Sequence, residues 1–393
     1  MRPVRWFICC MLMMLLPPHT GWGQQPPKLP RNLSPQSRIS LLTISPGDEL
    51  YSTFGHSAIR IVDPVYHMDR VYNYGTFSFD EPWFYLKFAR GQLDYQLSAY
   101  PYGYADMVYR QEKRSVVEQI LGLTLKQRND VYHFLEINYL PENRKYRYDF
   151  FFDNCATRIR DVFKTVLGDS LEYFLNPTRK LTFRQYLDLY LKNHPFSDFG
   201  IDLGLGARAD RIASPWEAMF LPDFLYESFD KATIVINGEK KPLVVKRNTL
   251  LWYDVPERKQ KALPYPSIIF WMLLVFTLLL SLGNYRGIQF VRKLEKILDT
   301  LLYSSIGLLG ILILLLWFAT DHKVTPENWN LLWSWPTHIL LIWMYRLHQR
   351  PRWVSTYFLV NTLIMGLVLL GWSWIPQMYH PAVLPIIFLM GYR

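Results

Sequence analysis

Cys155 is the residue of this sequence with the clearest capacity for chemistry, because a cysteine thiolate is a strong nucleophile. It lies in the stretch YDFFFDNCATRIRD, residues 148–161. The chain has three cysteines, but Cys9 and Cys10 lie inside the apolar run of an N-terminal targeting segment. Cys155 is therefore the only cysteine expected in the mature chain, where no intrachain disulfide can form. The alternative to a nucleophile is a small, buried apolar side chain.

A thiol-dependent site also needs an imidazole within hydrogen-bond reach and a third polar group that orients the ring. His56 lies in FGHSAIRIVD, where polar and apolar residues alternate as they do on a strand. Asn73 lies in VYNYGTFSF, a second predicted strand that follows a turn at Asp63. We expect the two strands to pair, which would bring Asn73 close to His56. The predicted catalytic group is Cys155, His56 and Asn73, with His67 as the alternative third member.

The elements around Cys155 would present its sulfur to a substrate. Aromatic residues predict a strand over residues 146–152, and apolar residues at helical spacing predict a helix over residues 156–167. Asp153 or Asn154 would be the N-cap of this helix. The unpaired N–H groups and the helix dipole at such a helix start favour a thiolate. A backbone N–H there could also stabilise an oxyanion.

The rest of the N-terminal part alternates between predicted strands and helices, which indicates an α+β fold. A capping box at Thr124 and Gln127 opens a helix, and Asn237-Gly238 between apolar runs predicts a hairpin. The glycine-rich residues 200–206 lack the Lys-Ser/Thr pair of a phosphate loop and predict a turn or strand edge. The further predicted strands are residues 39–45, 92–97 and 115–121, and the predicted helices are residues 82–90, 124–139 and 182–192.

A shift in composition divides the chain into three parts. Residues 1–23 have the layout of a secretory signal peptide. Residues 24–264 form a predicted periplasmic domain, which begins with a Pro- and Gln-rich linker. Residues 265–393 form a predicted all-α membrane domain with four or five transmembrane helices. The expected spans are residues 263–283, 301–319, 331–345 and 353–374, and residues 382–390 form a fifth apolar segment that is short for a span.

The distribution of basic residues indicates the orientation in the membrane. The net charge is +10, but the Lys and Arg residues are scattered, so we expect no nucleic-acid partner. Residues 284–300 and 346–352 are basic loops, whereas residues 320–330 carry only Lys323. Because basic loops stay in the cytoplasm, the N-terminal domain is expected in the periplasm. The chain is thus predicted to be a multi-pass protein of the inner membrane.

The segments FGHSAIRI, YNYGTFSF and DNCATRIRD, with TDH and NWNLLW after the second span, resemble the Lnb-type family of Gram-negative membrane proteins. The order of a His strand, a polar residue on the next strand and an Asn-Cys pair at a later helix also resembles the permuted NlpC/P60 superfamily. This superfamily includes the lecithin:retinol acyltransferase group. The resemblance covers nearly the whole mature chain and implies a permuted papain-like periplasmic domain. The Lnb-type family is associated with lipoprotein N-acylation by a Cys/His pair, which implies these roles for Cys155 and His56.

Our first hypothesis from the sequence is therefore a lipoprotein N-acyltransferase. A phospholipid would be the acyl donor, Cys155 would carry the acyl chain as a thioester, and the N-terminal amine of a lipidated cysteine in a lipoprotein would be the acceptor, with no cofactor. The membrane helices favour this chemistry, because an enzyme that takes acyl chains from phospholipid must hold them. The alternatives are a periplasmic cysteine peptidase or amidase that acts on cell-wall peptides, and a non-enzymatic binding module of the envelope.

Four further polar residues are candidates for substrate binding: Asn154, Arg158, Asp321 and His322. Arg158 either binds a phosphate group or pairs with Asp153. Asp321 and His322 follow the second span, where they either position a headgroup or lipoprotein or are ordinary charges of a solvated loop. The nine histidines include no close-spaced pair suited to zinc, so no metal is expected.

Overall fold

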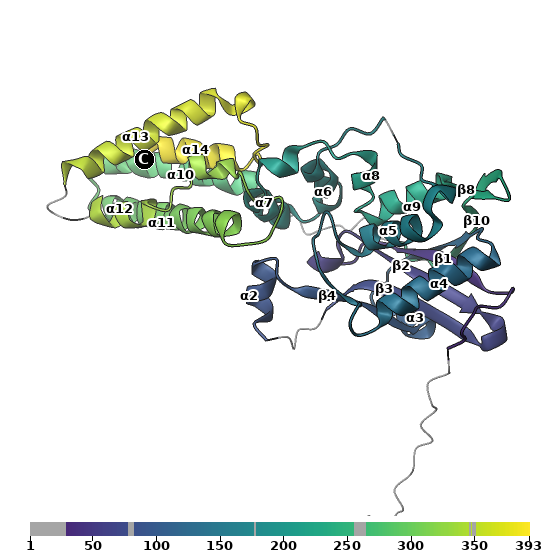
Figure 1. The fold of residues 1–393 in the computed structure, drawn as a ribbon. Helices are drawn as coiled ribbons and strands as arrows, with labels where there is room; N and C mark the ends of the chain where they lie inside the picture. Colours follow the sequence, from purple (N-terminus) through teal and green to yellow (C-terminus); the bar gives the residue numbers. More distant parts are fainter. Residues whose placement is uncertain (1–28, 78–81, 177, 255–264, 346, 348–350) are drawn as a thin grey trace, which may run out of the picture.

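The computed structural model describes residues 29–77, 82–176, 178–254, 265–345, 347 and 351–393. It contains a mixed α/β N-terminal domain followed by a helical region (Figure 1). The predicted signal peptide, residues 1–23, lies outside the described residues, as does the junction at residues 255–264.

A seven-stranded antiparallel sheet forms the centre of the N-terminal domain. Its middle strands are buried along almost their whole length, which fits their long apolar runs. The predicted pairing of the His56 and Asn73 strands is confirmed, with Ile59 opposite Tyr72. In sheet order, the strands are β10 (Val244–Leu251), β5 (Val116–Leu121), β1 (Arg38–Ile44), β2 (His56–Asp63), β3 (Met68–Thr76), β4 (Asp94–Pro101) and β6 (Lys145–Arg147).

Helices cover both faces of this sheet. On one face, α5 (Cys155–Leu167) packs across β2 and β3, and α4 (Leu125–Tyr139) lies beside α5. On the other face, α3 (Tyr102–Gln111) buries Ala105 and Tyr109 against β1, β2 and β3. Because α5 begins above the strands that carry His56 and Asn73, the sheet itself positions the start of this helix.

The predicted helix cap at Thr124 and the predicted hairpin at Asn237-Gly238 are confirmed. Thr124 and Gln127 form the predicted capping box at the start of α4. Asn237 and Gly238 join β8 (Thr233–Ile236) to β9 (Glu239–Pro242), and both have positive φ, as a tight hairpin turn requires. This hairpin belongs to a second sheet with β7 (Leu171–Glu172).

The segment before Cys155 differs from the prediction. Only β6 is a strand, whereas the expected strand covered residues 146–152. The carboxylate of Asp149 accepts hydrogen bonds from the backbone N–H groups of Phe151 and Phe152, each at 3.0 Å. This side chain closes a local turn that competes with a strand.

A second group of helices follows α5, and it corrects the expectation for residues 200–206. The helix α7 (Pro195–Gly204) passes through Gly200, and its first residue is a proline, which favours a helix start. The other helices of this group are α6 (Phe183–Leu191), α8 (Pro215–Ala218) and α9 (Pro222–Lys231).

In the C-terminal region, three of the described helices are long and apolar enough to cross a membrane: α10 (Pro266–Tyr285), α11 (Gln289–Phe318) and α13 (Arg352–Leu370). The helix α14 (Val383–Tyr392) is shorter. The expected span at residues 331–345 is helical only from His338, in α12 (His338–Tyr345). A 3-10 turn held by Asn328 precedes it, and Pro336 cannot continue a helix toward the N-terminus. The number of crossings stays a prediction.

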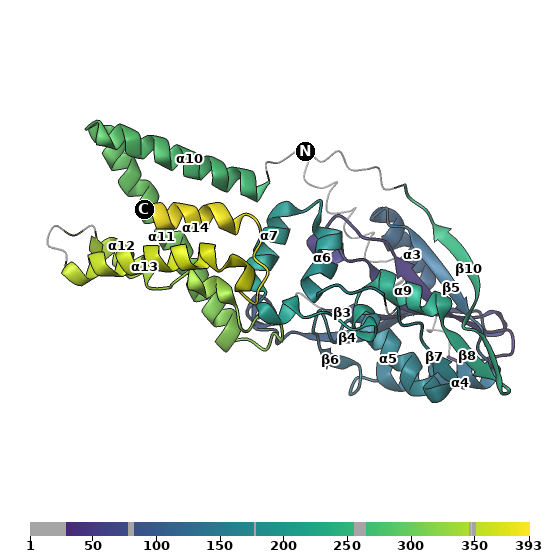
Figure 2. The same cartoon turned by 90° about the horizontal axis from the view of Figure 1, so that it is seen from above.

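The loop after α11, residues 319–328, contacts the N-terminal domain. The backbone N–H of Gly206, which follows α7, donates a hydrogen bond to Val324 O of this loop at 2.9 Å. Arg208 forms an ion pair with Glu327 of the same loop at 2.9 Å. Phe199 of α7 packs with residues of the membrane helices. Both views show α7 between the sheet and the membrane helices (Figures 1 and 2).

Candidate active site

Cys155 is the first residue of α5, and the helix start is strongly held. Asn154 is its N-cap, and Asn154 Oδ1 accepts hydrogen bonds from the N–H groups of Ala156 and Thr157 at 2.9 and 3.0 Å. The Asn154 side-chain amide donates to Phe150 O and Phe220 O at 2.7 and 2.8 Å. The thiol is half-buried. It therefore lies at the positive end of a rigidly capped helix.

The histidine is at the start of β2, and its ring is oriented by β3. His56 Nε2 and Asn73 Oδ1 are 2.6 Å apart, and Asn73 Nδ2 donates to the Tyr100 hydroxyl at 2.8 Å. Cys155 is close enough to His56 to raise the pKa of the imidazole. Because Nε2 faces Asn73, Nδ1 is the ring nitrogen left for the thiol. The structure thus brings Cys155, His56 and Asn73 together in one chain of side-chain contacts.

The thiol and the imidazole shift each other's pKa. Burial alone would raise the pKa of the Cys155 thiol, but the charge and hydrogen bond of His56 and backbone hydrogen bonds from Ser57 and Ala156 lower it below its ordinary value. Burial alone would lower the pKa of His56, but the charge and hydrogen bond of Cys155 raise it, helped by Asn73. Both shifts favour a thiolate–imidazolium pair.

Aromatic residues and one glycine complete the surroundings of the thiol. Burial and the nearby charge of Cys155 raise the pKa of Tyr148 well above its ordinary value, so its hydroxyl stays neutral. Tyr148 stacks on Tyr95 with ring centroids 4.1 Å apart. Gly75 has a φ of +94° at an irregularity of β3, and a Cβ there would be 3.8 Å from Cys155 Cβ. The sequence did not single out Tyr100 and Tyr148. Tyr148 lies in the aromatic segment before Cys155, which was the available signal, whereas Tyr100 reaches Asn73 only because β4 pairs with β3.

The other predicted site residues have different surroundings. All hydrogen-bonding groups of the Asn154 side chain are used inside the protein, so its observed role is to hold the start of α5. Arg158 pairs with Asp153 and lies 4.1 Å above the Tyr146 ring, which is the structural alternative that the sequence left open. His67 is exposed in the turn at the far end of the β2–β3 hairpin. Asn73, and not His67, lies at the His56 ring.

Asp321 and His322 lie where the loop after α11 meets the N-terminal domain. The Asp321 N–H donates to Arg90 O at 2.9 Å, and its carboxylate accepts from Gln92 Nε2 at 3.0 Å. His322 Nε2 is 3.2 Å from Ala89 O. These two residues thus join the two parts of the chain.

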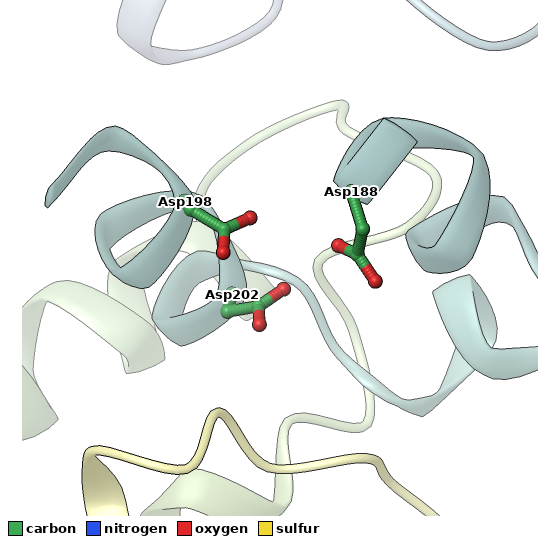
Figure 3. A group of neighbouring side chains, drawn as sticks. All are labelled: Asp188, Asp198 and Asp202. Atoms are coloured by element: carbon green, nitrogen blue, oxygen red, sulfur yellow. The ribbon is translucent and has the colours of Figure 1, made fainter. Parts of the chain in front are cut away.

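Three carboxylates gather where α6 and α7 meet (Figure 3). Oxygens of Asp188, Asp198 and Asp202 lie within 4.8 Å of one another. Asp202 pairs with Arg184 at 2.7 Å, and Asp198 lies 3.6 Å from His380 Nε2. Burial and the two neighbouring carboxylates raise the pKa of Asp188 to about 7. The ion pair between Arg184 and Asp202 and the raised pKa of Asp188 reduce the repulsion among these carboxylates, and we assign the cluster a structural role.

The fold and the apolar helices define a membrane protein in which a folded α/β domain precedes the apolar helices in the sequence. Comparison with protein families identifies both parts. The model of the Lnb N-terminal periplasmic domain matches residues 27–187, and the model of the Lnb transmembrane domain matches residues 258–393. The chain belongs to the Lnb family, as its motifs indicated. No curated protein and no solved structure matches the chain.

Proposed function

We propose that this protein is a lipoprotein N-acyltransferase that uses Cys155 as its nucleophile. The observation that carries the proposal is Cys155 at the start of a capped helix, close to a His56 ring whose Nε2 contacts Asn73 Oδ1. A nucleophile, a base and a residue that orients the base are the parts that acyl transfer through a covalent intermediate requires. A histidine strand beside a cysteine helix also fits a permuted papain-like arrangement.

The first half-reaction removes an acyl chain from a phospholipid. The Cys155 thiolate attacks the ester carbonyl and forms a C–S bond. The C–O bond then breaks, the His56 imidazolium gives its proton to the departing alkoxide, and a lysophospholipid leaves. The N–H of Cys155 belongs to the first turn of α5, whose N–H groups have no partner within the helix, and it is our candidate donor to the oxyanion.

The second half-reaction transfers the chain to a lipoprotein. The N-terminal amine of the lipidated cysteine attacks the thioester carbonyl, and neutral His56 accepts the proton that the nitrogen loses. The C–S bond breaks, which regenerates the thiolate beside the imidazolium. Asn73 holds the ring in one orientation through both steps.

The contact between the two parts of the chain supports a lipid substrate. Lys323, five residues after α11, lies 3.7 Å from Asp149 and above the Phe152 ring, in the segment that leads to Cys155. The segment that leads to the thiol thus contacts the loop that follows a membrane helix. Arg292 and Lys293 are at the other end of α11, which fits a periplasmic N-terminal domain and an inner-membrane location.

Two substitutions test this proposal. In phospholipid vesicles with a diacylated lipopeptide, Cys155→Ser and His56→Ala should each lower N-acylation by about three powers of ten or more, because neither remaining group can replace a nucleophile or its base. Mass spectrometry of the lipopeptide measures the product, and an acyl adduct on Cys155 should accumulate without acceptor. Both variants should unfold at nearly the wild-type temperature.

Wild-type activity in either variant at normal expression would rule out the proposed site. Altered cell-wall peptides with normal lipoprotein N-acylation in cells that lack the protein would favour the alternative, a periplasmic cysteine peptidase or amidase.

A further inference from the structure

The short helix α2 (Phe84–Ala89) presents large apolar side chains to the surface of the N-terminal domain. Trp83 is 78% exposed, Leu86 is 54% exposed and Phe88 is 56% exposed. Trp83 also has a φ of +60°, a left-handed conformation that is costly for a bulky residue. The chain therefore exposes a large apolar side chain from a residue in a costly backbone conformation.

The same helix lies beside the end of a membrane helix. Arg90 O, at the C-terminus of α2, accepts the hydrogen bond from the Asp321 N–H, and His322 contacts Ala89 O. Asp321 is three residues beyond Phe318, where α11 ends, so at most about 11 Å of chain separates them. Interfacial helices bury their apolar face roughly 5–10 Å deep at the boundary between headgroups and acyl chains, a depth of the same order.

Gly91 makes this close approach feasible. It has a φ of +64°, and a Cβ at this position would be 3.1 Å from the His322 ring. A side chain here would push the loop after α11 away from α2. The position of α2 at the end of α11 is thus built into the backbone.

A continuous series of aromatic rings connects α2 with the thiol. The exposed ring of Phe88 is at one end of the series. Tyr148 is at the other end, where burial and the nearby charge of Cys155 raise the pKa of its hydroxyl. The ring centroids are 6.3 Å apart from Phe88 to Phe84, 5.7 Å from Phe84 to Phe77, 5.0 Å from Phe77 to Tyr95 and 4.1 Å from Tyr95 to Tyr148.

We propose that α2 is a membrane-docking element that inserts Trp83, Leu86 and Phe88 into the bilayer leaflet on the side of the N-terminal domain. The occupant of this apolar surface is phospholipid and not a protein, because α2 is hydrogen-bonded to the loop directly after α11, a helix long and apolar enough to span the bilayer. Tryptophan favours this interfacial depth, and the exposed side chain of Arg90 suits phosphate headgroups. The aromatic series then forms the apolar wall along which an acyl chain reaches Cys155, and this second part rests on the proposed function.

A depth measurement tests the docking without any enzymatic readout. Full-length protein with Cys9, Cys10 and Cys155 replaced by serine is reconstituted in phosphatidylethanolamine–phosphatidylglycerol nanodiscs, and a bimane fluorophore is attached through Leu86→Cys. Spin-labelled lipids should quench this fluorophore at least threefold more than one attached through Ile137→Cys, a residue of α4 that is 60% exposed. Figures 1 and 2 show α4 away from the membrane helices. Equal, weak quenching at both positions would overturn the proposal.

An activity measurement tests the consequence of docking. In the protein with its native Cys155, the change Leu86→Glu, outside the aromatic series, should lower acyl transfer from vesicle phospholipid about tenfold. Transfer from a soluble short-chain thioester and alkylation of Cys155 by iodoacetamide should stay unchanged, and Ile137→Glu should alter none of the three rates.

Unchanged transfer from vesicles would contradict the proposal, and so would an equal loss with both donors, which would indicate a damaged active site. If the protein is not an acyltransferase, the wild type itself transfers nothing, while lipid quenching at position 86 still occurs. Failure of the docking and failure of the proposed function are therefore distinguishable.

Discussion

The Cys155 thiol and the His56 imidazole lie where burial opposes any charge, yet each becomes charged because the other does. As pH rises through the lowered pKa of Cys155, the thiolate forms. As pH rises further through the raised pKa of His56, the imidazolium is lost. The two groups titrate as a coupled pair, and the reactive form is the one with a single proton shared out between them, so the rate should follow a bell-shaped pH profile.

Asn73→Ala should move only the alkaline side of this profile. The Asn73 hydrogen bond raises the pKa of His56, so its loss should shift the alkaline limb to lower pH and narrow the plateau. We expect about a tenfold lower maximal rate, which is less than the roughly 10²–10⁴-fold contribution of a general base. The measurement is the pH dependence of N-acylation and of Cys155 alkylation.

Tyr100→Phe is the matched control for Asn73→Ala. This change keeps Asn73 beside the His56 ring and removes only the hydroxyl that accepts from Asn73 Nδ2. The alkaline limb of the pH profile should therefore move less in Tyr100→Phe than in Asn73→Ala. An alkaline limb that stays in place in Asn73→Ala would mean that Asn73 does not orient or charge His56.

The start of α5 places the thiol, and a single buried side chain fixes this start. Asn154 binds two N–H groups of the first turn and two carbonyls, one at Phe150 in the segment just before the helix and one at Phe220 in a distant segment. An ordinary N-cap side chain only accepts hydrogen bonds from the N–H groups of the first turn. Asn154 therefore couples the helix start to its tertiary surroundings.

Asn154→Ala should lower the free energy of unfolding by about 2–4 kcal/mol, since it removes the cap and leaves two carbonyls without their donor. It should also slow alkylation of Cys155, because the frayed first turn no longer favours the thiolate. Chemical denaturation and alkylation rates measure the two effects.

Thr124→Ala is the comparison for Asn154→Ala, since Thr124 caps α4 in the same way without a tertiary partner in this role. It should cost about 1 kcal/mol and leave the thiol rate unchanged. Asn154→Ser, which keeps a cap acceptor, should restore part of the rate. Equal thiol rates in Asn154→Ala and Thr124→Ala would contradict the role of Asn154.

The two parts of the protein interlock closely enough to act as one unit. Gly206 lies against the loop after α11, where an added Cβ would be 1.9 Å from Pro326 O. Gln377 Nε2 donates to Leu205 O at 3.0 Å from the segment before α14. This docking keeps α2 and the segment before Cys155 against the loop after α11, which is the arrangement that the proposed lipid donor requires.

Gly206→Ala should loosen this docking. The clash is with backbone atoms, so we expect a loss of about 1–3 kcal/mol in stability and a steep fall in acylation from vesicles. The control is Gly200→Ala, where nothing lies within 4 Å of the added Cβ. Thermal unfolding in nanodiscs and vesicle acylation compare the two, and equal behaviour would refute the importance of the interlock.

Local signals predicted the parts of this protein that depend on neighbours in sequence. The capping box at Thr124, the Asn237-Gly238 hairpin and the cysteine at a helix start each rest on contacts within a few residues. Prediction failed where a local polar side chain or a proline, and not the apolar pattern, decided the structure. Asp149 closes a turn where a strand was predicted, and α7 includes Gly200, where a turn or strand edge was predicted. The helix α12 begins at His338, after Pro336, and not at residue 331.

By itself, the sequence determined the candidate nucleophile, the strands of His56 and Asn73, and the apolar character of the C-terminal helices, because periodicity and caps are local properties. Only the tertiary structure decided that Tyr100 and Tyr148 join the site and that Asp321 meets Gln92 across 229 residues. Contacts of such long range depend on how the sheet, α5 and the membrane helices pack together, and no spacing along the chain encodes that packing.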